Sequence, residues 1–245
     1  MTQHEAVVQT LENLDGAATL GQLYTEVFKV KDCKWKTKTP NASIRRIVQL
    51  SKDIYKIKPG LYGLVAKRSS IEGRGIFAET EKNKNSKEVT EFNHYYYQGL
   101  LLSIGRMRRF DCWCPDQDKN RLCVNQRLGA LRTLDEIPPF SYPGLVTRST
   151  TVDVIWFNGR KMPNSFFEVE HQGEMQNSLI KFDDLQDFSA QMVIVANEMH
   201  RQNYEKRKRH AAFESISDRL KFLNYESLVA QYEGIVASSK GEVVL

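Results

Sequence analysis

The chain has 245 residues, a net charge of +5 and four cysteines, with hydrophobic and charged contents that are ordinary for a globular protein. This length allows one large domain or two modest ones, and no apolar run is long enough to span a bilayer. The sequence lacks a signal-peptide pattern and a dense cysteine framework, which excludes a secreted disulfide scaffold. We therefore expect a cytoplasmic protein with reduced thiols.

Positive charge is concentrated in the N-terminal quarter. Residues 1–70 contain 12 Lys and Arg against 6 Asp and Glu, whereas the remaining residues contain 23 against 24. Such an excess indicates a module that binds phosphate groups.

The N-terminal elements follow the order helix, helix, helix, strand, strand. Thr39-Pro40 is a typical helix start, and Pro59-Gly60 marks the turn between the strands. This order predicts a winged helix-turn-helix domain over residues 1–66. The predicted helices cover residues 3–13, 18–28 and 42–50, and the predicted strands cover 54–57 and 61–65.

The early Ala6-Val7 pair, residues 39–45 (TPNASIR) and residues 59–64 (PGLYGL) resemble the HARE-HTH winged-helix modules attached to chromatin proteins and restriction endonucleases. The resemblance covers residues 3–66 and implies that the third helix faces DNA, with basic residues on phosphates. The alternative is a winged helix that binds protein, its basic side chains merely solvated. The implied DNA contacts are Lys34, Lys36, Lys38, Thr39, Asn41, Ser43, Arg45, Arg46, Lys56 and Lys58.

Residues 67–90 are rich in Ser, Gly, Glu, Lys and Asn and have little apolar periodicity, which predicts a linker. A second domain is expected over residues 91–245. Its first helix, residues 91–108, has a broad apolar face that includes Gln98. The other predicted helices cover 174–188, 197–213 and 227–232, and the predicted strands cover 110–115, 151–157, 165–169, 192–196 and 221–223.

A polar loop is expected over residues 116–132. Its Lys119, Asn120 and Arg121 form a second candidate for reading DNA. The nearby Cys112, Cys114 and Cys123 have a spacing that is uncommon in structural zinc sites. Cysteines in an apolar strand more often behave as small hydrophobic residues, so a zinc site is the less favoured interpretation.

Three carboxylates interrupt two strands that are otherwise apolar. Asp153 lies in the strand over 151–157, and Glu168 and Glu170 lie two residues apart in or next to the strand over 165–169. Turn-forming residues join the strands into a β-hairpin, which brings Asp153 back to Glu168. Buried acids are unfavourable unless they are paired or bind a cation. Converging oxygen ligands predict a Mg²⁺ site, whereas acids at a sheet edge would simply be solvated.

Over residues 90–235, the order helix, strand, strand, strand, helix, strand (αβββαβ), with Asp153 followed by Glu168-Val169-Glu170, resembles the PD-(D/E)xK restriction endonuclease superfamily. The resemblance implies that Asp153 and Glu168 are direct Mg²⁺ ligands and that the Val169 carbonyl completes the site. Glu170 stands where the motif usually has Lys, although some restriction enzymes of this superfamily carry Glu there. We expect it to orient or deprotonate the attacking water, or to share a second ion.

Three further residues are candidates for supporting the site. Gln98 would reach a metal-bound water or phosphate, and Gln172 would contact a phosphate. Lys181, on the following helix, would supply the displaced positive charge of the motif, although a surface Lys on an amphipathic helix is the alternative. His171 is expected on the opposite strand face, in a structural role.

The sequence thus predicts an α+β or α/β protein with an N-terminal winged helix and a restriction-endonuclease-like core. The expected activity is that of a type II restriction enzyme, which hydrolyses both strands of double-stranded DNA at a specific sequence with Mg²⁺, as a homodimer at least on DNA. One alternative is a modification-dependent restriction endonuclease. Another is a DNA-binding regulator whose nuclease half is inactive.

Overall fold

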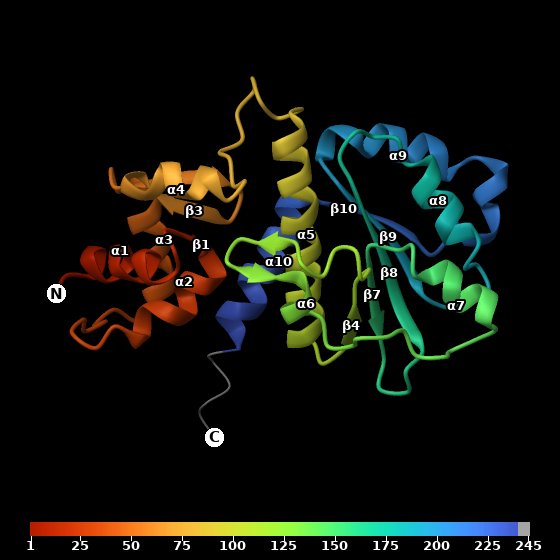
Figure 1. The fold of residues 1–245 in the computed structure, drawn as a ribbon, viewed down its shortest axis with the longest axis horizontal. Coiled ribbons are helices and arrows are strands. Elements are labelled where there is room, and N and C mark those ends of the chain that lie inside the picture. Colours follow the sequence, from red (N-terminus) through yellow and green to blue (C-terminus); the bar gives the residue numbers. More distant parts are fainter. Residues whose placement is uncertain (240–245) are drawn as a thin grey trace. The chain divides into compact units, whose positions relative to one another are not determined.

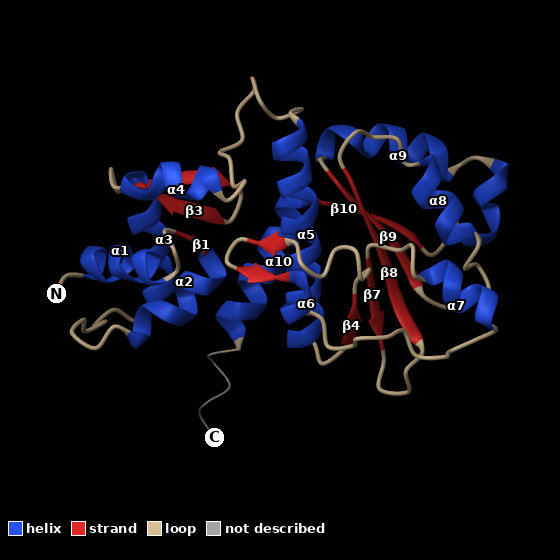
Figure 2. Cartoon of the chain, in the orientation of Figure 1, coloured by secondary structure: helices blue, strands red, loops and turns tan. Residues whose placement is uncertain are grey.

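The computed structural model describes residues 1–239 and has the mixed α+β architecture expected from the sequence (Figure 1; Figure 2). The chain forms two compact units. The first comprises Met1–Asn93 together with the chain from Val229 onwards, and the second comprises His94–Leu228. Over the described residues, none of the helices combines the length and the apolar character that crossing a bilayer demands.

These units divide the chain differently from the expected boundaries. The expected linker, residues 67–90, contains helix α4 (Arg68–Gly73), in which Ile71 is fully buried. The end of the C-terminal helix, expected in the second domain (91–245), packs into the first unit, where Val236 joins the core. Residues 67–90 are polar on average, but a few buried apolar side chains are enough to pack such a segment into a unit. Average composition does not show these side chains.

The first unit contains a three-stranded antiparallel sheet of order β1-β3-β2 and the helices that pack on it. Capping boxes start its first two long helices, one formed by Thr2 and Glu5 and the other by Thr19 and Gln22. The predicted helix over 18–28 starts later than expected, because its first residues pair with β3 as a strand. The elements are α1 (Gln3–Asn13), β1 (Ala17–Thr19), α2 (Leu20–Glu26), η1 (Val27–Lys29), α3 (Pro40–Leu50), β2 (Ile54–Lys58), β3 (Leu61–Leu64), η2 (Val65–Lys67) and α4.

The second unit is built on a five-stranded mixed sheet of order β10-β9-β8-β7-β4. Strands β4, β7 and β8 pair antiparallel, whereas β8, β9 and β10 pair parallel. The elements from α5 onwards are α5 (Lys87–Met107), β4 (Asp111–Trp113), β5 (Leu122–Cys123), β6 (Gln126–Arg127), α6 (Leu128–Leu131), α7 (Pro143–Ser149), β7 (Val154–Phe157), β8 (Pro163–Glu170), α8 (Gln176–Asp183), β9 (Gln191–Ala196), η3 (Glu198–His200), α9 (Arg201–Lys208), η4 (Ala211–Ile216), β10 (Leu220–Asn224) and α10 (Tyr225–Ser238).

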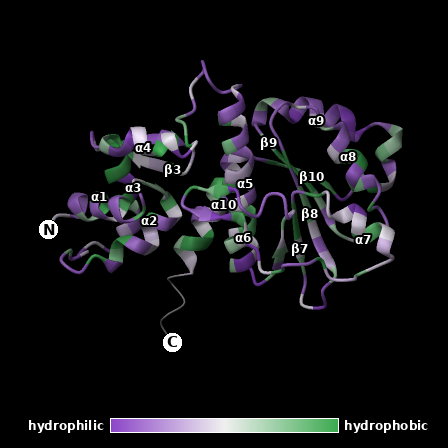
Figure 3. Ribbon diagram, viewed as in Figure 1, coloured by the Kyte–Doolittle hydropathy of each residue, from purple (hydrophilic) through white to green (hydrophobic). Residues whose placement is uncertain are grey.

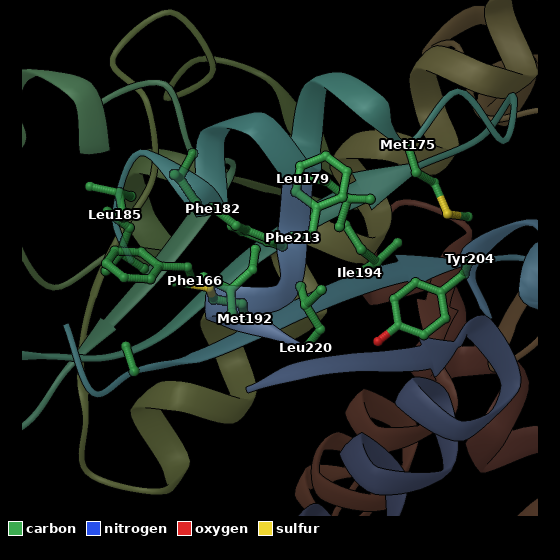
Figure 4. Packing of buried hydrophobic residues seen from close by; sticks show 14 of the residues in the cluster. Phe166, Met175, Leu179, Phe182, Leu185, Met192, Ile194, Tyr204, Phe213 and Leu220 are labelled. Carbon is green, nitrogen blue, oxygen red and sulfur yellow. The ribbon is translucent and has the colours of Figure 1, made fainter. Parts of the chain in front are cut away.

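Helices cover both faces of this sheet. On one face, Leu179 and Phe182 of α8 pack with Phe166 of β8 and Ile194 of β9 (Figure 4). On the other face lies α5, whose Leu101 carbonyl accepts a hydrogen bond from the Trp156 indole at 3.1 Å. Because side chains alternate along a strand, every second residue of β8 after Phe166 faces α8.

Two predicted elements differ from the structure. The expected polar loop over 116–132 contains the short β5–β6 hairpin and α6. The expected helix over 197–213 is divided into η3, α9 and η4. The Asn197 side chain caps its start, and the His210 ring caps the separate start of η4. Helix α7 was not expected from periodicity, because only one of its residues, Ser149, is buried.

Candidate active site

The turn of the β7–β8 hairpin folds the chain so that Asp153 lies beside the end of β8. Asp153 directly precedes β7, and its Oδ2 accepts a hydrogen bond from the Val169 backbone N–H at 2.8 Å. Its own backbone N–H donates to Oε1 of Glu168 at 3.2 Å. The two acids therefore meet at one end of the hairpin instead of pointing to opposite sides of the sheet.

Glu168 and Glu170 are two residues apart and face α8 together. The Ser178 hydroxyl on α8 lies 3.0 Å from Oε2 of Glu168 and also makes a short contact with Oε1 of Glu170. A hydroxyl group has one hydrogen and serves one carboxylate at a time. When the hydroxyl donates to one of the two carboxylates, the other needs a proton or a cation to be stabilised at this place.

Lys181 supplies the positive charge nearest to the acids. Its Nζ lies 2.7 Å from Oε2 of Glu168 and donates to the Thr151 carbonyl at 2.8 Å. Lys181 follows Ser178 by three residues, so one side of α8 presents both groups to the acids. The structure thus places Lys181 at the acid cluster, which we define as Asp153, Glu168 and Glu170.

The acid cluster has more acidic groups than basic ones beside it. Burial raises the pKa of Asp153, Glu168 and Glu170 above the ordinary range, and the charge of Asp153 further raises the pKa of Glu168. Lys181 acts in the opposite direction on all three. One ammonium group facing three carboxylates leaves a site that gains from a further cation.

The described part of the chain contains no group of three or more His, Cys, Asp or Glu side chains arranged around one point as a metal site. Lys181 and Ser178 contact the Oε2 oxygen of Glu168, one of the oxygens that the predicted Mg²⁺ would use. The cysteines of the zinc interpretation, Cys112, Cys114 and Cys123, are buried. Burial raises the pKa of Cys112 and Cys114 to about 12, so both are neutral thiols within the core.

Helix α5 contributes two polar residues to the cluster. Gln98 is fully buried, and its Nε2 donates to Oδ2 of Asp118 at 3.2 Å and to the Asp153 carbonyl at 3.1 Å. Its Oε1 has no hydrogen-bond partner in the described chain. One turn earlier, Nε2 of His94 lies 3.6 Å from Oδ1 of Asp153, and burial lowers the pKa of the imidazole.

Sequence reasoning missed His94, Asp118 and Ser178. The spacing of four residues between His94 and Gln98 is a signal that could have been read, because both lie on one side of α5. Asp118 and Ser178 left no comparable pattern. Each reaches the cluster only through the packing of a distant segment.

Gln172 and His171, which follow β8, have different surroundings. Gln172 is exposed and makes no hydrogen bond to the acid cluster. The Tyr225 hydroxyl donates to the Glu170 carbonyl at 2.6 Å and lies 2.7 Å from Nδ1 of His171. The centre of the His171 ring lies 5.7 Å from the centre of the His94 ring. His171 therefore borders the acid cluster, although strand alternation predicted that it would face away from it.

The expected DNA contacts of the first unit fall into three groups. Lys58 is 2% exposed, with its Nζ 3.8 Å from a Glu79 oxygen and over the Phe92 ring, so it is not available as a phosphate contact. The guanidinium of Arg45 lies 2.7 Å from Oε2 of Glu233, on α10. The other eight lie on the surface, exposed or half-buried: Lys34, Lys36, Lys38, Thr39, Asn41, Ser43, Arg46 and Lys56.

The candidate reading loop of the second unit is exposed. Lys119 lies 3.6 Å from Asp116, and the Arg121 guanidinium lies over the Tyr95 ring at 5.1 Å. Asn120 accepts a hydrogen bond from Arg127 at 3.3 Å. These side chains are partly engaged with neighbours, but they remain on the surface next to the β5–β6 hairpin.

A family profile described as "Type II restriction enzyme NmeDI C-terminal domain" matches residues 76–240. This match covers more than half of the chain and includes the acid cluster, α5 from its first residue and the whole five-stranded sheet. Comparison with curated proteins and with solved structures gave no match.

Proposed function

Because the chain belongs to the family of the type II restriction enzyme NmeDI C-terminal domain and is thereby a restriction endonuclease, we propose that it cleaves both strands of double-stranded DNA at a specific sequence, with Mg²⁺ bound at the acid cluster. The observation that carries the catalytic proposal is the convergence of Asp153 and Glu168, two buried acids 15 residues apart, on one point beside Lys181. The arrangement of strands and acids supports membership of the PD-(D/E)xK superfamily.

The donor set fits a hard divalent cation. Carboxylate oxygens of Asp153 and Glu168 and the Val169 carbonyl are the oxygen ligands that Mg²⁺ prefers. The shared Ser178 hydroxyl and the raised pKa values of the acids indicate a site that lacks positive charge. When bound, Mg²⁺ would neutralise charge on the phosphate and lower the pKa of a coordinated water.

The residues of the chain itself have the remaining roles: accepting a proton, neutralising charge on the phosphate and positioning the acids. Glu170, half-buried and with a raised pKa, accepts a proton from the attacking water at a carboxylate oxygen. Lys181 neutralises charge that develops on the phosphate, replacing the Lys that the motif usually carries at position 170. Gln98 and His94 hold Asp153 from the α5 side, and Ser178 holds Glu168 and Glu170 from α8.

The first unit is proposed as a winged-helix DNA-binding module. Its three helices and its three-stranded sheet with a β2–β3 hairpin have the required order, and the exposed Lys and Arg around α3 supply positive charge. Cleavage of both strands by identical sites requires two copies of the acid cluster. We therefore propose a homodimer, formed at the latest on DNA.

The test is cleavage of a panel of plasmid and phage DNAs, unmodified and methylated, with Mg²⁺ or with EDTA. We expect Mg²⁺-dependent cutting at defined positions, reduced at least about a hundredfold by Asp153→Asn or Glu168→Gln. The matched controls are Asp187→Asn and Glu136→Gln, which change exposed acids outside the cluster. Wild-type cleavage by the Asp153→Asn variant would remove the acid cluster from the mechanism.

A second candidate function is a DNA-binding regulator with an inactive nuclease half. Glu170 in place of the usual Lys favours it, as does the contact of Lys181 with a proposed ligand oxygen of Glu168. The same assay separates the candidates. If no DNA of any modification state is cut in Mg²⁺ while DNA binding persists, the regulator is the better description. Cutting confined to methylated DNA would instead indicate a modification-dependent endonuclease.

A further inference from the structure

The second unit has an open cleft of about 500 Å³ between α8 and the segment formed by α9 and η4. Figure 1 shows these helices side by side on one face of the sheet. The cleft is lined by polar and basic side chains over an apolar floor that includes Phe213 and Ile180. None of its lining residues belongs to the acid cluster.

Helix α8 separates this cleft from the acid cluster. Gln176, Ile180 and Asp183 recur at intervals of four and three residues and line the cleft. Ser178 and Lys181 lie on the opposite side of the helix, where they contact the acids. One helix, about 10–12 Å across with its side chains, therefore stands between the two sites.

Three neighbouring side chains orient Arg207 at the wall of the cleft. Its Nε donates to Asn203 at 3.3 Å, and its two terminal nitrogens donate to Gln176 at 3.2 Å and to Glu174 at 3.4 Å. A guanidinium group has five N–H donors, so two remain for a ligand. Fixing the group in advance reduces the entropy lost when an anion binds.

The other basic groups of the cleft, on Lys206 and His210, keep N–H donors available for a ligand. Lys206 is exposed and makes no hydrogen bond or ion pair with the described residues. Nδ1 of His210 accepts the Ala212 backbone N–H at 3.2 Å, which leaves Nε2 to carry the proton and donate. Of the acids nearby, Asp183 accepts a hydrogen bond from Ser215 at 3.0 Å, and Glu174 pairs with Arg207.

The segment that includes α9, residues 201–210, carries more positive charge than its acidic neighbours pair with. Residues 201–210 contain five Lys and Arg and one Glu. The segment is hydrophilic over most of its length (Figure 3). Among its cations, Arg201 pairs with Glu198, whereas Lys206 and Arg209 have no acidic partner in the described chain.

We propose that the α8–α9 cleft binds a phosphodiester group of the DNA, several base pairs from the phosphate that is cleaved. This proposal rests on the proposed function, because it takes the acid cluster as the point of cleavage. Ten base pairs of duplex span about 34 Å, so DNA seated on the acid cluster extends well past the width of α8. The bidentate fork of Arg207, with Lys206 and His210, suits a phosphate oxygen pair.

The experiment measures the salt dependence of binding to a 30-base-pair duplex by fluorescence anisotropy. It uses the full chain with Asp153→Asn, in EDTA, so that no DNA is cut. Lys206→Gln should lower the slope of log K against log salt by about 0.9, the value for one lost phosphate contact. Arg160→Gln is the matched control, because it removes an exposed charge at the β7–β8 turn, the other end of the hairpin from the acids.

Acetylation of lysines followed by mass spectrometry gives an independent readout. DNA should protect Lys206 from acetylation and leave Lys161, at the β7–β8 turn, reactive. An unchanged salt slope with Lys206→Gln, or an equal drop with Arg160→Gln, would overturn the proposal, as would unprotected Lys206. These results do not depend on cleavage. A chain that cuts DNA while Lys206 has no effect refutes the cleft alone. Protected Lys206 in a chain that cuts nothing supports the phosphate contact of the cleft and refutes the proposed cleavage.

Discussion

The ammonium group of Lys181 lies 2.7 Å from the carboxylate of Glu168, although the two residues are 13 positions apart in the chain. On the proposed PD-(D/E)xK assignment, the positive charge that the motif usually places on the strand reaches the acids from helix α8 instead. Glu170, at the motif's last position, faces the same point through Ser178. Two acids, a further carboxylate and one ammonium group thus meet at one place, although they come from separate segments of the chain.

We expect Lys181→Gln to reduce DNA cleavage by about 10²- to 10³-fold, the usual effect of removing one group that stabilises transition-state charge. The reduction should lie in the rate of a single turnover and not in DNA affinity. Lys181→Arg, which keeps the charge, should recover part of the rate. Lys221→Gln, an exposed Lys on β10, is the control. Equal rates for Lys181→Gln and the unaltered protein would assign Lys181 to stability alone.

Stability without divalent cations should depend on pH through the buried acids. The folded-state pKa values of Asp153 and Glu168 lie above their ordinary values of 3.8 and 4.5. The stabilisation from a raised pKa is present at low pH and is lost as the pH rises towards the raised value. Urea denaturation in EDTA should therefore give a free energy of unfolding that falls from about pH 5 to about pH 8.

Asp153→Asn should reduce that fall, because the amide does not ionise, while Asp187→Asn should leave it unchanged. A pH profile that is the same with and without Asp153 would contradict the assignment of this dependence to the acid cluster.

Added Mg²⁺ should raise the melting temperature of the unaltered protein at about pH 8, because a ligand that binds only the folded state stabilises it by mass action. Glu168→Gln should abolish this rise, and Glu136→Gln should preserve it. The measurement is thermal unfolding over a range of Mg²⁺ concentrations, without DNA. A rise that survives Glu168→Gln would place the cation elsewhere.

Freeing Arg45 from its partner should strengthen DNA binding if α3 faces DNA. Glu233→Gln removes the charge that lies 2.7 Å from the Arg45 guanidinium. The freed guanidinium can make one further phosphate contact, so affinity should increase and the slope of log K against log salt should become steeper by about 0.9. Glu12→Gln, an exposed acid on α1, is the control. Unchanged affinity with Glu233→Gln would indicate that Arg45 does not contact DNA.

Close packing of α5 makes Gly99 sensitive to substitution. A Cβ at this position would collide with the Cys123 side chain. Overpacking costs about 1–3 kcal/mol, against a gain of about 1 kcal/mol in helix propensity, so Gly99→Ala should lower the denaturation midpoint. Gly159→Ala, whose Cβ would meet open space, should not. A midpoint for Gly99→Ala equal to that of the unaltered chain would show that the Cys123 segment moves aside.

Local patterns predicted most of the regular elements. The predicted helix over 3–13 coincides with α1, and the predicted strands lie within two or three residues of the observed ones. Apolar periodicity, caps and turn residues act between neighbours in the chain, which makes these elements readable from sequence. Periodicity failed at 197–213, where the His210 ring caps the start of a separate helix, η4.

The sequence by itself determined that three acids interrupt two apolar segments and that a hairpin returns Asp153 to Glu168, since turn and alternation rules need no distant information. In the structure Glu168 and Glu170 lie in β8, whereas Asp153 lies just before β7 and not in the expected strand. The tertiary structure decided between the two interpretations of Lys181, which lies at Glu168, and it alone showed that Ser178, His94 and Asp118 lie nearby. It also showed that Lys58 is buried and that Arg45 is paired. These outcomes depend on which helix packs on which face of a sheet. Such packing follows from the burial of the whole chain, and a single stretch of sequence does not encode it.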